Sequence, residues 1–120
     1  KNILNDDLLL RKIINADELE YCIHGTYYKF LPQIKEFGGL SSMKRKHVHF
    51  STKPFRSEKT ISGMRHNCEV LIYLDIKKTL EEGIEIFISD NDVALIPGNI
   101  SYHLFEKICD ANTGKQIKFD

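Results

Sequence analysis

Short runs of β-forming residues separated by turn signals constrain the fold of this 120-residue chain more than any other feature. The longest run, Glu69–Asp75, is nearly continuous in branched and aromatic residues, which is typical of a central strand. Its apolar part, Val70–Leu74, is far shorter than the roughly 20 residues that a membrane-spanning helix needs. We therefore expect one globular domain over residues 1–120, with no membrane partner.

Helical periodicity is confined to three places. Apolar spacing predicts a short helix over 6–15, a helix from Tyr28 to Phe37 with Pro32 in its first turn and Gly38 at its end, and one or two turns over 76–82. The expected strands are 20–23, 47–50, 69–75, 84–88, 93–96, 104–109 and 116–119. Because strands outnumber helices, the pattern favours an α+β fold, with a mostly antiparallel sheet of short strands and a few flanking helices, over a doubly wound sheet.

The charge is neutral overall but unevenly distributed. Seventeen basic residues balance seventeen acidic ones. The segment from Met43 to Arg65 nevertheless holds seven basic residues against the single acid Glu58. Such a segment can bind a polyanion locally, and the alternative is a solvated basic loop.

Cysteine usage points to a reducing compartment. The three cysteines are widely spaced and form neither a zinc motif nor an even set for disulfides. We expect buried free thiols and, without a recognisable targeting segment, a cytoplasmic or nuclear protein.

The sequence contains no P-loop, dinucleotide-binding glycine motif, nucleophile elbow or zinc-protease helix motif. Three other clusters of residues remain as candidates for a functional site. His24-Gly25-Thr26 follows a predicted strand, where glycine lets a ligand approach the backbone and the two side chains offer hydrogen bonds to ribose or phosphate. The alternative is a turn in which Thr26 caps the next helix.

The second cluster runs from Met43 to Phe50, and the third from Ser62 to His66. His47 and His49 share one face of a predicted strand and could bind a metal as a pair, but anion recognition by Arg45 is the better interpretation. The third cluster again combines a small residue, a glycine and an arginine, and its alternative is a loop with one solvated Arg65.

Taken in order, these clusters resemble the RNA 2′-phosphotransferase family, often called tRNA 2′-phosphotransferase. The resemblance extends from about His24 to Lys107 with order and spacing kept. The matching motifs are His24-Gly25-Thr26, Met43-x-Arg45-x-His47-Val48-His49-Phe50, Ile61-Ser62-Gly63-Met64-Arg65, Phe87-x-Ser89, Asn91-x-Val93-x-Leu95 and Pro97-Gly98-Asn99.

The resemblance implies an ADP-ribosyltransferase-like fold and an NAD+-dependent transferase that uses no metal. The family moves the 2′-phosphate at a tRNA splice junction to ADP-ribose, giving 2′-hydroxyl RNA, nicotinamide and ADP-ribose cyclic phosphate. Arg45 corresponds to the 2′-phosphate clamp. The residues that the resemblance places around NAD+ are His24, Gly25, Thr26, His47, His49, Ser51, Ser62, Gly63 and Arg65.

Two departures from the family pattern bear on these expectations. Asp92 stands where the family usually has glycine, and we expect it to keep the same left-handed turn. The family also has an N-terminal winged-helix-like lobe that binds RNA and supplies an Arg-His pair and a further Arg. No Leu-Arg-His segment precedes His24 here, so the resemblance implies that this chain is the C-terminal lobe alone, which we expect to bind NAD+ weakly and to be a poor catalyst.

Other functions stay open at this point. An ADP-ribosyltransferase acting on nucleic-acid phosphate ends would use the same NAD+ pocket. Many protein-modifying ADP-ribosyltransferases have a glutamate where Val93 stands, whereas the RNA 2′-phosphotransferases have an apolar residue there, as this chain does. A non-catalytic domain that binds NAD+ or ADP-ribose is the alternative outside enzymes.

Overall fold

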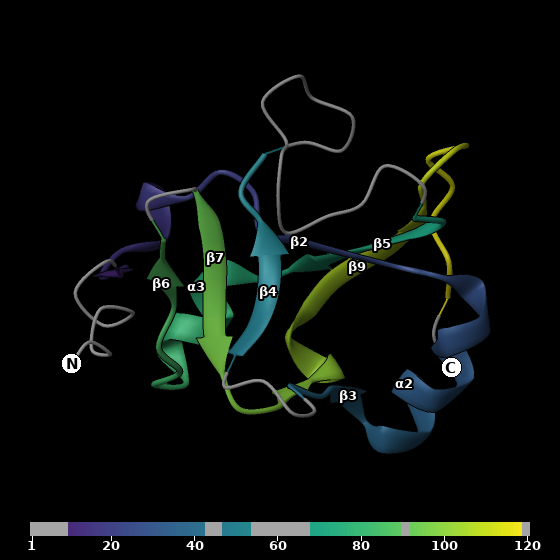
Figure 1. The fold of residues 1–120 in the computed structure, drawn as a ribbon, viewed down its shortest axis with the longest axis horizontal. Coiled ribbons are helices and arrows are strands. Elements are labelled where there is room, and N and C mark those ends of the chain that lie inside the picture. Colours follow the sequence, from purple (N-terminus) through teal and green to yellow (C-terminus); the bar gives the residue numbers. More distant parts are fainter. Residues whose placement is uncertain (1–9, 43–46, 54–67, 90–91, 119–120) are drawn as a thin grey trace, which may run out of the picture.

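The computed structural model describes residues 10–42, 47–53, 68–89 and 92–118. A seven-stranded antiparallel sheet dominates this part of the chain, in the order β1-β6-β7-β4-β2-β5-β9. Its strands are β1 (Arg11–Lys12), β2 (Ile23–Thr26), β4 (His47–Ser51), β5 (Val70–Leu74), β6 (Phe87–Ile88), β7 (Val93–Pro97) and β9 (Phe105–Asp110). In Figure 1, β6, β7 and β4 stand upright whereas β2 and β5 run across, which displays the strong twist of a sheet built from short strands.

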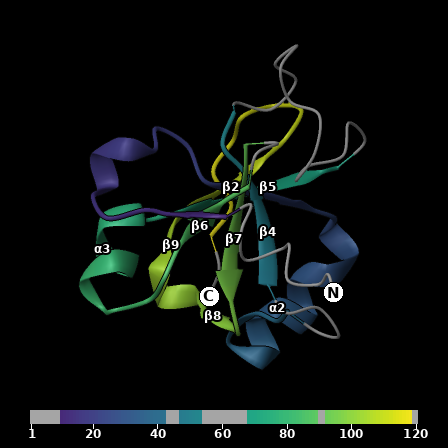
Figure 2. The same ribbon diagram turned by 60° about the vertical axis from the view of Figure 1, so that its left-hand side comes forward.

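A second, two-stranded sheet pairs β3 (Gly39–Leu40) with β8 (Ile100–Ser101). The helices are α2 (Leu31–Phe37) and α3 (Ile76–Glu81), with 3₁₀ turns η1 (Ala16–Glu18), η2 (Tyr28–Phe30) and η3 (Tyr102–Leu104). Figure 2 separates α3 on its left side from α2 near the bottom. The mixed α+β class with a mostly antiparallel sheet is confirmed.

One face of the large sheet carries the main core. Phe50, Ile72, Ile96 and Leu104 of η3 are fully buried there, and Ile34 of α2 packs in the same cluster. A smaller cluster of Ile23, Cys68 and Leu71 covers part of the opposite face. Cys22, Cys68 and Cys109 are buried free thiols, as expected from their spacing.

Two expected elements are wrong at the start of the chain. The helix over 6–15 is contradicted by β1, in which Arg11 and Lys12 pair with Ile88 and Phe87 of β6, while residues 6–9 lie outside the described part. The sheet edge offers hydrogen bonds and buries Ile13, which outweighs the weak helical spacing. The predicted strand 20–23 instead begins at Ile23 and contains His24, Gly25 and Thr26.

Most of the remaining elements lie close to their predicted places, but the strand expected over 84–88 is reduced to β6, Phe87–Ile88. Pro32 occupies the first turn of α2, and Gly38 ends that helix with a left-handed φ of 94°. Asp92 has the left-handed φ of 63° expected of the turn before β7. The expected strand 116–119 is reduced to a single bridge between Gln116 and Cys109 within the described residues, which end at 118.

Candidate functional site

The pairing of β2 with β4 brings two sequence clusters together. Ile23 of β2 lies opposite Ser51 of β4. His24, the next residue of β2, is therefore adjacent to β4, the strand that contains His47 and His49. Residues 23–26 also pair along their whole length with β5. The pairing with β5 explains why His24-Gly25-Thr26 is a strand and not the turn predicted after one, since pairing with a buried strand outweighs the low strand propensity of Gly25.

The predicted site residues divide between the two faces of the sheet. His24 is opposite Ile72 and Thr26 is opposite Val70, so both side chains point to the main core face. His47 and His49 alternate with buried Val48 and Phe50 and therefore point to the other face.

A cleft of about 530 Å³ opens beside His24 and Thr26. Its lining comes from β2, η2, α2 and β3, and comprises His24, Thr26, Phe30, Gln33, Ile34, Phe37, Gly39, Leu40 and Ser41. The lining is mostly apolar, with a few polar groups at defined places. That combination is typical of small-molecule sites.

His24 is held by the backbone of β4. Its Nδ1 lies 2.9 Å from the carbonyl oxygen of His49. Since a carbonyl oxygen only accepts, Nδ1 carries the proton and Nε2 of the neutral ring is a hydrogen-bond acceptor. Among the described residues Nε2 has no hydrogen-bond partner. The ring also contacts Phe50 edge-on, with centroids 5.6 Å apart.

Burial keeps this histidine neutral. Desolvation lowers the pKa of His24 below its ordinary value and outweighs the opposing effect of the hydrogen bond to His49, while the charge of His49 acts in the same direction as burial. A neutral imidazole with a free Nε2 recognises a donor, such as a hydroxyl group, better than it recognises a phosphate oxygen.

The η2 turn that carries Phe30 to the cleft is held by Glu69, the residue before β5, and by Asp110 of β9. The main-chain N–H of Tyr28 donates to Glu69 Oε1 at 3.0 Å, and the Tyr28 hydroxyl donates to Asp110. Asp110 also accepts from the main-chain N–H groups of Asn112 and Thr113. These contacts lower the pKa of Asp110 to about 2, with the Tyr28 hydroxyl as the largest cause.

The other predicted residues are placed as follows. The His47 ring lies 6.4 Å from that of Phe87. Ser51 is 1% exposed, and its Oγ donates to the carbonyl of Lys53 and accepts from the Lys53 N–H. Arg45, Ser62, Gly63 and Arg65 lie outside the described residues.

Sequence reasoning missed the helical wall of the cleft. Phe30, Gln33, Ile34 and Phe37 are spaced as one helical face. Phe30 and Phe37 are 38% and 54% exposed, so this helical face is only partly covered by the core and is open to the cleft. The available signal was a polar Gln33 inside an otherwise apolar face.

Comparison with known proteins gives a consistent result. The model of the RNA 2′-phosphotransferase, Tpt1/KptA family matches residues 1–98. The zebrafish (Danio rerio) tRNA 2′-phosphotransferase 1 is 40% identical over 96 residues, covering 78% of this chain and 42% of that protein. The Saccharomyces cerevisiae tRNA 2′-phosphotransferase is 34% identical over 110 residues, covering 90% of this chain and 47% of that protein. The chain thus spans less than half the length of these relatives. None of the helices in the described ranges is long and apolar enough to cross a membrane.

Proposed function

Since the chain belongs to the RNA 2′-phosphotransferase, Tpt1/KptA family, we propose that it is the NAD+-binding lobe of an enzyme that removes a 2′-phosphate from tRNA. In this proposal the phosphate passes to ADP-ribose, and 2′-hydroxyl RNA, nicotinamide and ADP-ribose cyclic phosphate are released. The lobe has an ADP-ribosyltransferase-like fold, and no metal takes part.

The observation that carries the proposal is the neutral His24 beside a mostly apolar cleft. A volume of about 530 Å³ lies within the roughly 300–1,000 Å³ of small-molecule sites and fits one nucleoside half of NAD+. Nε2 of His24 accepts a hydrogen bond from a ribose hydroxyl. Phe30 and Phe37 provide apolar surface for a ring, and the Gln33 amide provides a donor and an acceptor for its edge.

The chemistry of the transfer matches the residue types in the sequence. NAD+ supplies an activated ribose carbon and a leaving group. The 2′-phosphate is already an oxyanion, so the protein must position it and balance its charge instead of removing a proton. Arg45 has the planar, permanently charged group suited to that role. Gly25 and Thr26 belong to the same strand as His24, and we propose that Ser62, Gly63 and Arg65 extend the NAD+ pocket. The side chains of His47, His49 and Ser51 lie on the other face of the sheet, so any contact that they make with NAD+ lies outside the His24 cleft.

The chain spans less than half the length of the zebrafish and yeast relatives. We propose that an N-terminal lobe of the whole protein adds further cationic groups that contact the phosphate and the RNA. Each such group is worth a few kcal/mol of transition-state stabilisation, on the order of 2.7–4 kcal/mol. The 120-residue chain then binds NAD+ but turns over slowly. A single-turnover rate equal to that of a complete relative would contradict this division of labour.

The first test is a thermal-shift titration with NAD+ and ADP-ribose. A ligand that binds only the folded state raises the melting temperature. We expect a rise for the wild-type chain and a much smaller one for His24→Ala. The control His103→Ala changes an exposed histidine away from the cleft and should leave the rise intact. No rise at saturating ligand would count against an NAD+ pocket in this chain.

The second test separates the possible reactions. RNA with an internal 2′-phosphate is incubated with NAD+ and the chain, and the products are separated by chromatography. ADP-ribose cyclic phosphate supports the proposed transfer, whereas a stable ADP-ribosylated RNA end supports a nucleic-acid ADP-ribosyltransferase. Arg45→Ala should reduce the reaction while leaving the NAD+ thermal shift largely unchanged.

A further inference from the structure

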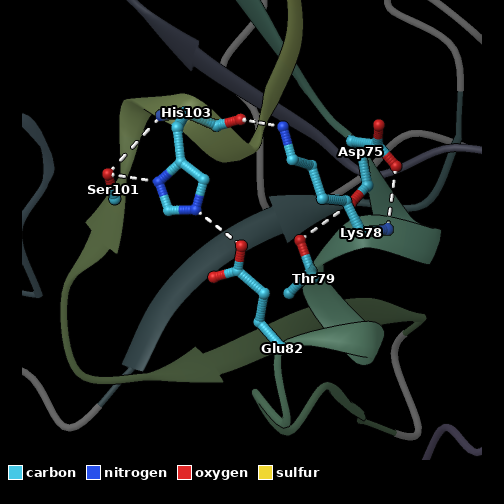
Figure 3. A network of polar contacts seen from close by, with 6 residues as sticks. All are labelled: Asp75, Lys78, Thr79, Glu82, Ser101 and His103. Atoms are coloured by element: carbon cyan, nitrogen blue, oxygen red, sulfur yellow. Dashed lines mark hydrogen bonds and ion pairs between the residues drawn. The ribbon is translucent and has the colours of Figure 1, made fainter.

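A second polar cluster lies where β8 and η3 meet the end of α3, and the transfer reaction does not use it. Figure 3 shows its six residues. Ser101 Oγ lies 2.7 Å from Nδ1 of His103, and Nε2 of the same ring lies 2.8 Å from Oε2 of Glu82. Serine, histidine and carboxylate are therefore connected in one line through the two ring nitrogens.

The chemistry of the partners determines the direction of these hydrogen bonds. An ionised Glu82 only accepts, so Nε2 of His103 carries a proton. In the neutral ring Nδ1 is then the acceptor, and Ser101 must donate its Oγ–H to it. This arrangement of a hydroxyl on a base that a carboxylate orients is the one used to activate serine nucleophiles, with the roles of the two ring nitrogens exchanged.

The cluster is held in place from α3. The Lys78 ammonium donates to the carbonyl of His103 at 3.1 Å, and the main-chain N–H of Asp75 donates to the carbonyl of Leu104 at 2.8 Å. Leu104 is fully buried, which anchors η3 in the core. The reacting groups nevertheless stay open to solvent, since the side chains of His103 and Glu82 are 47% and 40% exposed.

We propose that Ser101 is a nucleophilic site that takes acyl groups from activated carboxylic esters. Ser101 Oγ attacks the ester carbonyl carbon, and its proton passes to Nδ1 of His103 while Glu82 stabilises the imidazolium. The tetrahedral adduct then collapses, the carbon–oxygen bond to the leaving alcohol breaks, and His103 returns the proton to that alcohol. The product is an O-acyl Ser101 ester, and no oxidant or other co-reactant is needed.

The test is acetylation of the 120-residue chain by p-nitrophenyl acetate at mildly alkaline pH, with the modified residue located by peptide mass spectrometry. General-base assistance contributes about 10²–10⁴-fold in favourable sites, so we expect acetylation at Ser101 to be at least about tenfold faster than at Ser42. His103→Gln removes the base and should abolish this preference.

Glu82→Gln provides the sharper variant. Its amide can donate to Nε2 and thereby stabilise the tautomer in which Nδ1 carries the proton, so Ser101 loses its acceptor. We expect acetylation to slow, whereas Glu81→Gln, on the neighbouring residue, should leave it unchanged. Circular dichroism melting identifies any variant that fails to fold. Equal acetylation of Ser101 and Ser42 in the wild-type chain, or a Ser101 rate unaffected by both His103→Gln and Glu82→Gln, would overturn the proposal.

Discussion

The Nδ1 atom of His24 donates a hydrogen bond to the main-chain carbonyl of His49, and the distance between the two atoms is 2.9 Å. The contact therefore joins the side chain of His24 to the main chain of His49, and the two imidazole rings do not bond to each other through it. Their side chains point to opposite faces of the sheet. The contact determines which nitrogen of His24 is open to a ligand.

The first prediction concerns pH and the stability of the fold. The pKa of His24 is lower in the folded chain than its ordinary value of about 6.5. Between its folded pKa and its ordinary pKa, the unfolded chain binds a proton at His24 that the folded chain does not bind. In this pH range His24 therefore makes the free energy of unfolding decrease as the pH falls. His24→Gln should reduce this slope between pH 7 and pH 5 by at most about 1.4 kcal/mol per pH unit, the limit for one proton.

Urea unfolding at a series of pH values measures the slope. Thr26→Val is the matched control, because it alters the same strand and the same cleft without changing a titratable group. The control should shift the free energy of unfolding equally at every pH. Parallel pH profiles for the wild-type chain and His24→Gln would contradict the prediction.

The second prediction concerns Asp110, whose pKa of about 2 is lowered mainly by the Tyr28 hydroxyl. A carboxylate with a depressed pKa stabilises the fold above its unfolded value, and this stabilisation is lost as the pH falls toward the folded value. Asp110→Asn should therefore lower the urea midpoint at pH 6, and the difference from wild type should shrink from about pH 4 toward pH 2.

Two further variants make this test specific. Tyr28→Phe removes the hydroxyl that contributes most and should reproduce part of the loss at pH 6. Asp17→Asn changes an exposed carboxylate in η1 as a control. A difference between Asp110→Asn and wild type that is constant from pH 6 to pH 2.5 would show that Asp110 acts through packing and not through its charge.

Much of the fold could be predicted because its signals are local. The strand at 70–74 follows from a run of β-formers, and α2 follows from Pro32 at its start and Gly38 at its end. The pairing of β3 with β8 could not be predicted, since strands of two residues have no periodicity and depend on a contact between segments about 60 residues apart. β1 was missed for the same reason.

The candidate site also contains residues that the sequence predicts and residues that it does not. His24 and Thr26 were identified from sequence, and both line the cleft. The alternation of His47 and His49 with Val48 and Phe50 predicts which side chains of β4 face the core. Which of them share a face with His24 depends on the pairing of β2 with β4, which no local pattern encodes. The sequence predicts the helix but not the role of Phe30 and Gln33 in the cleft, because these side chains come to lie across the cleft from β2 only in the folded chain.

The third prediction compares two phenylalanines. Phe50 is fully buried and packs against the His24 ring, whereas Phe37 is 54% exposed at the rim of the cleft. Phe50→Ala should lower the free energy of unfolding by about 3–5 kcal/mol, the usual cost of removing a buried aromatic ring. Phe37→Ala should change it by roughly 0.5 kcal/mol or less. Urea unfolding measures both, and equal losses would contradict the burial difference.

The last prediction concerns Gly39, which forms part of the cleft wall and pairs with Ser101 of β8. Its φ is +152°, and a Cβ at this position would lie 1.9 Å from the carbonyl oxygen of Ile100 and 2.8 Å from the Cα of Ser101. Both neighbours are backbone atoms, so they cannot move aside as a flexible side chain would. Gly39→Ala must therefore push β8 away from β3.

Gly114→Ala is the matched control for backbone strain alone. Gly114 also has a positive φ, of +78°, but a Cβ there would meet nothing within 4 Å. We expect this control to cost about 1–2 kcal/mol in the free energy of unfolding, the usual penalty of a left-handed conformation for an alanine. Gly39→Ala should cost roughly 1–3 kcal/mol more, because overpacking is added to strain. It should also reduce the thermal shift by ADP-ribose, since β3 lines the cleft. Equal losses in the two variants would show that β8 yields to the added methyl group without cost.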